Sequence, residues 1–168
     1  MMIVGAMAIP QATAGLDRSR ANVAAKYLMA QMALARSQAV MRSASVGIRF
    51  GPAGTGYELE SFVDGNANGI RSRDIQAGID RRISAAQRLH EQFPTVTIDV
   101  RPDAGVEGDP VKFGVSSLLV FTPLGTATPG SVYVLGRDGT QFAIRVLGAT
   151  GRTRLQRYDV NARAWVDP

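Results

Sequence analysis

The sequence predicts an α+β fold in which a long N-terminal helix packs on a C-terminal antiparallel β-sheet. Two observations lead to this prediction. Between Gln11 and about Arg42 the chain has no proline and one glycine, and it is rich in Ala, Met, Leu, Gln and Arg, which favour a helix. Beyond Arg42 the apolar residues change from helical spacing to alternation, which is typical of half-buried strands. A helix followed by successive hairpins favours the α+β class.

Composition places the chain among ordinary folded proteins. Its 168 residues suit one domain, with 45% hydrophobic and 20% charged residues. The absence of cysteine excludes disulfides, thiolate zinc sites and cysteine nucleophiles. The net charge of +5 divides into +4 over residues 1–44, −2 over residues 45–136 and +3 over residues 137–168. A moderately basic surface of this kind favours association with phosphate or acidic lipid.

The helix predicted over about residues 11–42 is amphipathic. Its apolar residues recur at intervals of three and four, which places them on one side of a helix. One stripe consists of Leu28, Met32, Ala35 and Ala39. A flanking stripe consists of Val23, Tyr27, Ala30 and Leu34. We expect the first stripe to pack on the sheet.

The β-domain is predicted over about residues 45–158. The segment GPAGTG, residues 51–56, is expected to form the loop between a strand at 45–50 and a strand at 57–62. Asp138 and Gly139 are a strong signal for a tight hairpin. Further strands are expected at residues 95–100, 118–123, 131–136, 141–148 and 151–158. Residues 159–168 are expected to form a C-terminal tail.

The chain opens with an uncharged apolar run, MMIVGAMAIP. A membrane-spanning helix needs about 20 apolar residues, so this run is too short to cross a bilayer. It also lacks the basic start and small-residue cleavage site of a secretory signal. The run therefore either packs inside the domain or is the end of a longer hydrophobic segment.

The order of these elements resembles the type IV pilins and pseudopilins, in which the first half of an N-terminal helix is a membrane anchor. Within that class the chain resembles the minor GspH/FimT group. The matching segments are LARSQAVMRSASVGIRF, FVDGNANGIRSRDIQAGID, LVFTPLGTATPGSVYVLG and GRTRLQRYD. The resemblance implies that residues 1–10 are a remnant of the anchor and that residues 11–168 form a pilin-like globular domain.

The resemblance also implies a function. It indicates a minor structural subunit of a type II secretion pseudopilus or a type IV pilus, acting in filament initiation or tip assembly rather than as an enzyme. Its partners would be other pilins, met through an assembly face that consists of Leu28, Met32, Ala35 and Ala39. The full-length form would cross the bacterial inner membrane once, with the globular domain in the periplasm.

The family's leader, cleavage site, methylated first residue and nearby glutamate do not occur in this sequence, so we expect it to begin inside the anchor. Two other functions stay open. One is a DNA-binding minor pilin of a natural transformation system. The other is a non-pilin periplasmic domain that acts as an adhesin, a binding module or an enzyme.

The segment DGNANGIRSRD has the oxygen spacing of a calcium loop of the EF-hand type. The candidate ligands are side chains of Asp64, Asn66, Asn68 and Asp74, together with the Ile70 carbonyl. A calcium loop of this type closes with a carboxylate at position twelve, which Ile75 occupies here. The nearest carboxylate, that of Asp74, is at position eleven. Calcium is the one cofactor that this pattern suggests. The alternative is a loop of Asx turns, in which Asp and Asn bind their own backbone.

The C-terminal arginines are candidate phosphate ligands. On a strand over residues 151–158, Arg152 and Arg154 share one face, and two guanidinium groups so placed can grip successive phosphates. Arg157 and Arg163 would add charge nearby. A GRxR end is associated with DNA uptake in FimT-like members, so the resemblance implies a DNA contact here. The alternative is a solvated strand face with local pairing to Asp159.

The sequence gives little support to catalysis. His90 is the only histidine, so neither a two-histidine metal site nor a triad with a cysteine can form. The acids of residues 99–109 crowd a stretch rich in glycine and proline, which predicts a solvated loop rather than an apolar pocket with a raised carboxyl pKa. We therefore expect no small-molecule substrate.

Overall fold

A computed structural model describes residues 8–54 and 56–168. Helix α1 spans Ala8–Arg42. It ends where the sequence predicts, and its described part includes Ala8–Pro10, upstream of the predicted start at Gln11. Residues 1–7, most of the expected anchor remnant, lie outside the described residues.

The β-domain consists of two antiparallel sheets rather than the single predicted sheet. In the first sheet the strand order is β3-β2-β1-β7, and β4 also pairs with β2. Its strands are β1 Val46–Ala53, β2 Gly56–Val63, β3 Arg81–Arg82, β4 Gln87–Arg88 and β7 Leu118–Phe121. The β1–β2 pair continues to Ala53 and Gly56, so the predicted loop at 51–56 is wrong and the connection is shorter.

In the second sheet the strand order is β11-β10-β9-β8-β5, and β6 also pairs with β8. Its strands are β5 Val96–Ile98, β6 Val111–Lys112, β8 Gly130–Gly136, β9 Gln141–Leu147, β10 Arg152–Asp159 and β11 Ala164–Val166. Two short helices, α2 Ser72–Gln76 and α3 Leu89–Gln92, interrupt the connections.

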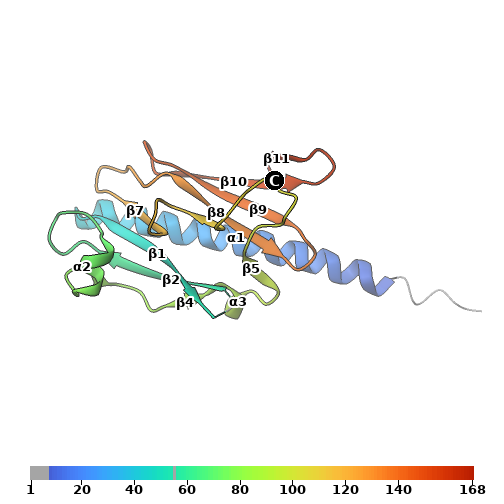
Figure 1. Cartoon of the computed structure of the whole chain (residues 1–168), viewed down its shortest axis with the longest axis horizontal. Coiled ribbons are helices and arrows are strands. Elements are labelled where there is room, and N and C mark those ends of the chain that lie inside the picture. Colours follow the sequence, from blue (N-terminus) through green and yellow to red (C-terminus); the bar gives the residue numbers. More distant parts are fainter. Residues whose placement is uncertain (1–7, 55) are drawn as a thin grey trace, which may run out of the picture.

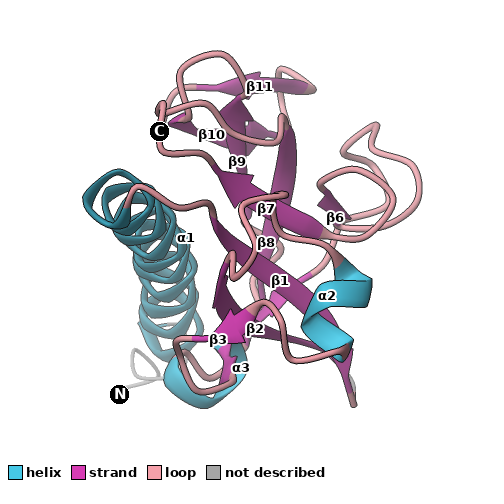
Figure 2. Ribbon diagram, turned by 90° about the vertical axis from the view of Figure 1, so that its left-hand side faces the viewer, coloured by secondary structure: helices cyan, strands magenta, loops and turns pink. Residues whose placement is uncertain are grey.

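Helix α1 runs along the domain and packs by one face on both sheets, which lie to the right of the helix in Figure 2 (Figures 1 and 2). It contacts strands of both sheets, including β1, β8 and β9. The buried helix residues are Ala21, Ala24, Ala25, Leu28, Met32, Ala35 and Ala39. The alanines let the helix approach the sheets closely. The prediction that the stripe through Leu28 and Met32 packs on β-structure is therefore confirmed.

The expected C-terminal tail is in part a strand. Asp159 accepts the backbone N–H groups of Asn161 and Ala162, and these bonds turn the chain back on itself. The returning strand β11 then places the ring of Trp165 against the rings of Tyr158 and Tyr133, at centroid distances of 5.3 and 5.6 Å. Packing of this half-buried ring on two tyrosines helps to hold β11 against β10.

Glu60 on β2 is a buried carboxylate held between two arginines. Its side chain is 8% exposed, and it accepts hydrogen bonds from Arg49 and, at 2.7 Å, from Nη1 of Arg82. Burial by itself raises the pKa of Glu60, but the two guanidinium groups outweigh it and the net pKa is lowered. This cluster ties β1, β2 and β3 together.

A lowered carboxyl pKa makes stability depend on pH. The stabilisation is present above the pKa of the unfolded state, about 4.3, and is lost as the pH falls through the lower pKa of the folded state. We therefore expect the free energy of unfolding to fall less between pH 6 and pH 3 in Glu60→Gln than in the wild type. Urea titrations at both pH values measure this, with Glu91→Gln, a 59% exposed side chain, as control. An equal fall in Glu60→Gln and the wild type would contradict the assignment.

Candidate functional site

The helix has a second apolar stripe, which faces away from the core. Its members are Leu16, Val23, Ala30, Leu34 and Met41, here called the outer stripe. Val23 and Leu34 are each 51% exposed, and Met41 is 80% exposed. The spacing of seven, seven, four and seven residues places them along one narrow stripe of the helix. Figure 2 shows α1 on one side of the molecule, with no other element over its outer face.

The predicted assembly face is wrong in its residues. Leu28, Met32, Ala35 and Ala39 are at most 3% exposed in the chain's own core, so they cannot meet another subunit. Most of the predicted flanking stripe lies on the outer face instead. Tyr27 is the exception, because its hydroxyl donates to Gln87 and its ring packs on Phe93. Helical spacing identifies two apolar stripes, but it does not say which one the sheets cover.

Among the described residues, no helix has both the length and the apolar content that crossing a membrane requires.

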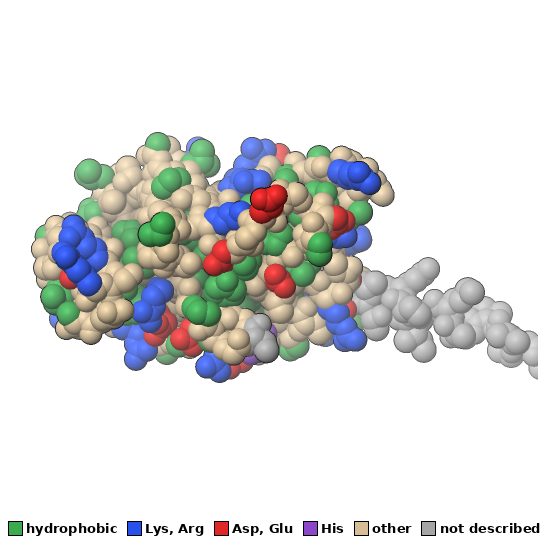
Figure 3. Space-filling view, in the orientation of Figure 1, with side chains coloured by type: hydrophobic (Ala, Val, Ile, Leu, Met, Phe, Trp, Pro, Cys, Tyr) green, Lys and Arg blue, Asp and Glu red, His purple; other side chains and the backbone are tan. Residues whose placement is uncertain are grey.

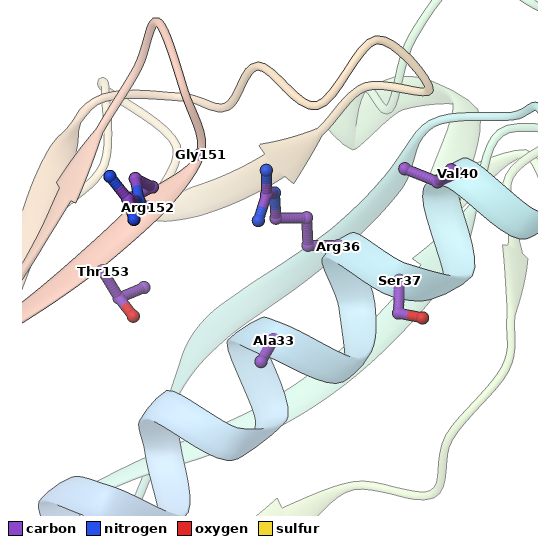
Figure 4. A pocket seen from close by; sticks show the side chains of 7 residues that line it. All are labelled: Ala33, Arg36, Ser37, Val40, Gly151, Arg152 and Thr153. Atoms are coloured by element: carbon purple, nitrogen blue, oxygen red, sulfur yellow. The ribbon is translucent and has the colours of Figure 1, made fainter.

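A groove lies between the C-terminal half of α1 and the start of β10. Its volume is about 550 Å³, and Figure 4 shows the side chains that line it: Ala33, Arg36, Ser37, Val40, Gly151, Arg152 and Thr153. Arg36 extends from the helix toward the strand that carries Arg152. We call this the basic groove. Sequence analysis singled out Arg152 but missed Arg36, because no local pattern joins the two segments.

The three arginines predicted to bind DNA do not form one patch. Arg154 binds Asp167 through Nε at 3.1 Å and Nη2 at 2.9 Å, so its guanidinium is already paired with a carboxylate. Arg157 is three residues from Arg154 along β10, so the two side chains lie on opposite faces of the strand. Arg157 lines a different cleft, together with Arg18 and Arg101. The expected local partner, Asp159, instead binds the turn before β11, which lowers its pKa. DNA contact through Arg152 stays a prediction.

The 64–74 loop is organised by side chains that bind its own backbone. Asp64 accepts the N–H groups of Asn66 at 3.0 Å and Gly69 at 2.7 Å. Asp80, which sequence analysis missed because it lies beyond the calcium-loop window, accepts the N–H groups of Gly65 at 3.2 Å and Arg71 at 3.0 Å. The bond from Asn66 to Asp64 is an Asx turn, the alternative that the sequence leaves open, and the other bonds tie more distant parts of the loop together.

The remaining candidate ligands take different positions. The Oδ1 atom of Asn66 accepts the N–H of Asn68 at 3.3 Å, and the side chain of Ile70 is buried against Phe62 and Leu118. Asp74 is buried in α2 beside Arg73. Within the part of the chain that the structure describes, no three His, Cys, Asp or Glu residues are grouped as a metal site. Calcium binding stays a prediction from spacing.

That prediction has a direct test. If the loop holds calcium, millimolar calcium raises the melting temperature by mass action, and Asp64→Asn, which removes the one full charge at the first position, abolishes the rise. Differential scanning calorimetry with calcium, and with magnesium as control, measures it. No calcium-specific rise in the wild type would show that the loop is only a turn.

The acids of residues 99–109 have structural partners. Asp109 accepts the hydroxyl of Tyr57 at 2.8 Å, and burial together with this hydrogen bond raises the pKa of Tyr57 to about 12. Asp103 binds the guanidinium of Arg101, which lowers the pKa of that carboxyl. These contacts fasten a loop, as the sequence predicts.

Comparison with known proteins gives the family. Residues 24–151, well over half of the chain, match the family model described as type II transport protein GspH. The fold is similar to the minor pseudopilin EpsH from the type 2 secretion system of Vibrio cholerae, with a TM-score of 0.52 and 13% identity over 81% of this chain and 95% of that one. No curated protein matches the chain. The resemblance inferred from the sequence is confirmed: the chain belongs to the GspH family of type II transport proteins.

Proposed function

We propose that this protein is a minor pseudopilin, a structural subunit of the periplasmic filament of a type II secretion system, acting in filament initiation or at the tip. The family match and the pilin-like fold support this proposal. Pseudopilins assemble with one another and are associated with the inner membrane and the periplasm. The proposal therefore includes a single membrane anchor at the N-terminus of the full-length form and a globular domain in the periplasm.

The outer stripe is the observation that carries the proposal. A soluble domain exposes single apolar residues at random, whereas five along one stripe of a helix mark a contact surface. The opposite face of α1 is used by the domain itself, so the outer stripe is the part of the helix available to neighbouring subunits. Packing of such stripes against one another would build the filament core.

The test is a charge placed in the outer stripe. Val23→Glu puts a carboxylate where apolar helices would meet, so we expect secretion of a type II substrate to fall at least about tenfold in the source bacterium. Val160→Glu is the matched control, because Val160 is 48% exposed, against 51% for Val23, and lies in the turn before β11. Substrate in the medium is measured with equal amounts of each variant in the cell.

A second measurement separates assembly from folding. The chain has no cysteine, so Val23→Cys and Val160→Cys each introduce a single thiol. We expect Val23→Cys to form disulfides with cysteines placed on the helices of other pseudopilins, and Val160→Cys to form none. Normal secretion by Val23→Glu, together with equal cross-linking at both positions, would rule out the outer stripe as an assembly surface.

A further inference from the structure

We propose that the basic groove binds a segment of a partner protein that presents a carboxylate between apolar side chains. The groove lies beside the C-terminal half of α1 (Figure 4), and none of its lining residues belongs to the outer stripe. It would thus give this subunit a second, chemically distinct contact.

The charge of the groove calls for an anion. Arg36 and Arg152 come from distant parts of the chain and line one groove, and no acidic residue lines it. Among the described residues, neither arginine forms an ion pair, whereas their neighbour Arg154 binds Asp167. Two guanidinium groups facing a common space, each with a planar set of donors, match the geometry of a carboxylate.

The turn before β10 lies close to Arg36. Gly151 has φ of +58°, and a Cβ atom at that position would lie 2.6 Å from the carbonyl oxygen of Gly125 and 3.3 Å from Nε of Arg36. Glycine at this position therefore permits the close approach of the turn to the Arg36 side chain.

Apolar side chains around the arginines favour a protein over a nucleic acid. Val40 lines the groove and is 52% exposed, and Leu147 pairs in register with Arg152 and is 54% exposed. Leu124, 92% exposed, precedes the glycine whose carbonyl lies against Gly151. These exposed apolar side chains could pack against apolar side chains that flank a carboxylate in a protein segment. A phosphate backbone has no apolar groups to pack against them.

The face of the molecule turned away from α1 offers nucleic acid no continuous basic surface. On the face shown in Figure 3 the basic side chains lie in separate groups, with acidic ones between them. Nucleic acid needs many phosphate contacts for useful affinity, because each neutralised phosphate contributes only about 0.9 to the logarithmic salt slope. Two arginines within an apolar border are better suited to one carboxylate.

The experiment uses the chain itself, labelled with ¹⁵N, and follows the Nε–Hε signals of the arginines by NMR. The probes are three capped nonapeptides with a central Glu and leucines one, two or three residues to either side, with matching Gln peptides as controls. A short DNA duplex is the fourth probe. We expect at least one Glu peptide to shift the signals of Arg36 and Arg152 and to saturate below about 1 mM. Its Gln counterpart should bind at least about tenfold more weakly.

Variants locate the binding. Arg36→Gln and Arg152→Gln should each weaken it about tenfold. Arg137→Gln removes the same charge from the β8–β9 turn, which lies against the other end of α1 near Ala21, and should bind as the wild type does. Failure of every Glu peptide, equal binding of Glu and Gln peptides, or no effect of the two groove variants would each overturn the proposal.

The DNA duplex tests whether the groove binds nucleic acid instead of a protein segment. If the duplex alone shifts the Arg152 signal, and salt abolishes the shift, the groove contacts nucleic acid and the proposal falls. Because peptide binding is measured on the isolated chain, its failure leaves the filament role untouched. Conversely, normal secretion by Val23→Glu would leave the groove proposal untouched.

Discussion

Leu28→Ala is expected to lower the free energy of unfolding by about 2–5 kcal/mol, the usual cost of truncating a leucine in a packed core. Leu28 is 1% exposed and lies in the middle of the buried helix face, which packs on strands of both sheets. The lost methyl groups leave a cavity that the surrounding backbone cannot easily close. Urea denaturation followed by circular dichroism measures the change.

Leu34→Ala provides the matched control on the same helix. Leu34 is 51% exposed and belongs to the outer stripe, so the same truncation should cost no more than about 0.5 kcal/mol. Equal losses from the two variants would mean that α1 does not hold to the sheets through the face described here.

Gly130→Ala is the other substitution with a large expected effect. A Cβ atom at Gly130, the first residue of β8, would lie 2.0 Å from the carbonyl oxygen of Lys112 and 2.6 Å from Cδ1 of Phe113. Lys112 is on β6, which pairs with β8, and the ring of Phe113 is fully buried and stacks on Phe50 at a centroid distance of 5.6 Å. Overpacking of this kind costs about 1–3 kcal/mol or more, so we expect a clear fall in melting temperature.

Gly15→Ala makes the same glycine-to-alanine change, but we do not expect it to lower the melting temperature. Nothing lies within 4 Å of a Cβ atom at Gly15, which is a helical position in α1, and alanine favours a helix over glycine by about 1 kcal/mol. We expect the melting temperature to stay the same or rise. A fall as large as that of Gly130→Ala would show that the loss comes from glycine replacement in general and not from the β6–β8 contact.

Local pattern accounts for the parts of the fold that were predicted. The helix ends at Arg42 and β1 begins at Val46 because the apolar period changes there, and the β8–β9 turn forms at Asp138 and Gly139. Strand β10 also lies where its alternation indicates. Each of these features depends on neighbours within a few residues, so the sequence records it directly.

The short strands could not be predicted in this way. Strands β3, β4 and β6 have two residues each, which is too few for a period, and they pair only because β2 and β8 offer free edges. The division into two sheets was not predicted either, because it depends on which strands pair along the whole chain. Helix α1 then contacts strands of both sheets through its one buried face.

For the candidate sites, the sequence by itself determined which residue types were available, and the tertiary structure decided what each one does. The sequence determined two apolar helix stripes, a polar loop at 64–74 and an arginine-rich end. These features indicated the family. Only the folded chain decided that Leu28 is core while Leu34 is surface, and that Asp167 binds Arg154. Only the fold brings Arg36 into one groove with Arg152. The physical reason is that burial and charge pairing depend on groups far apart in the chain, whose distances are set when the helix and both sheets pack together.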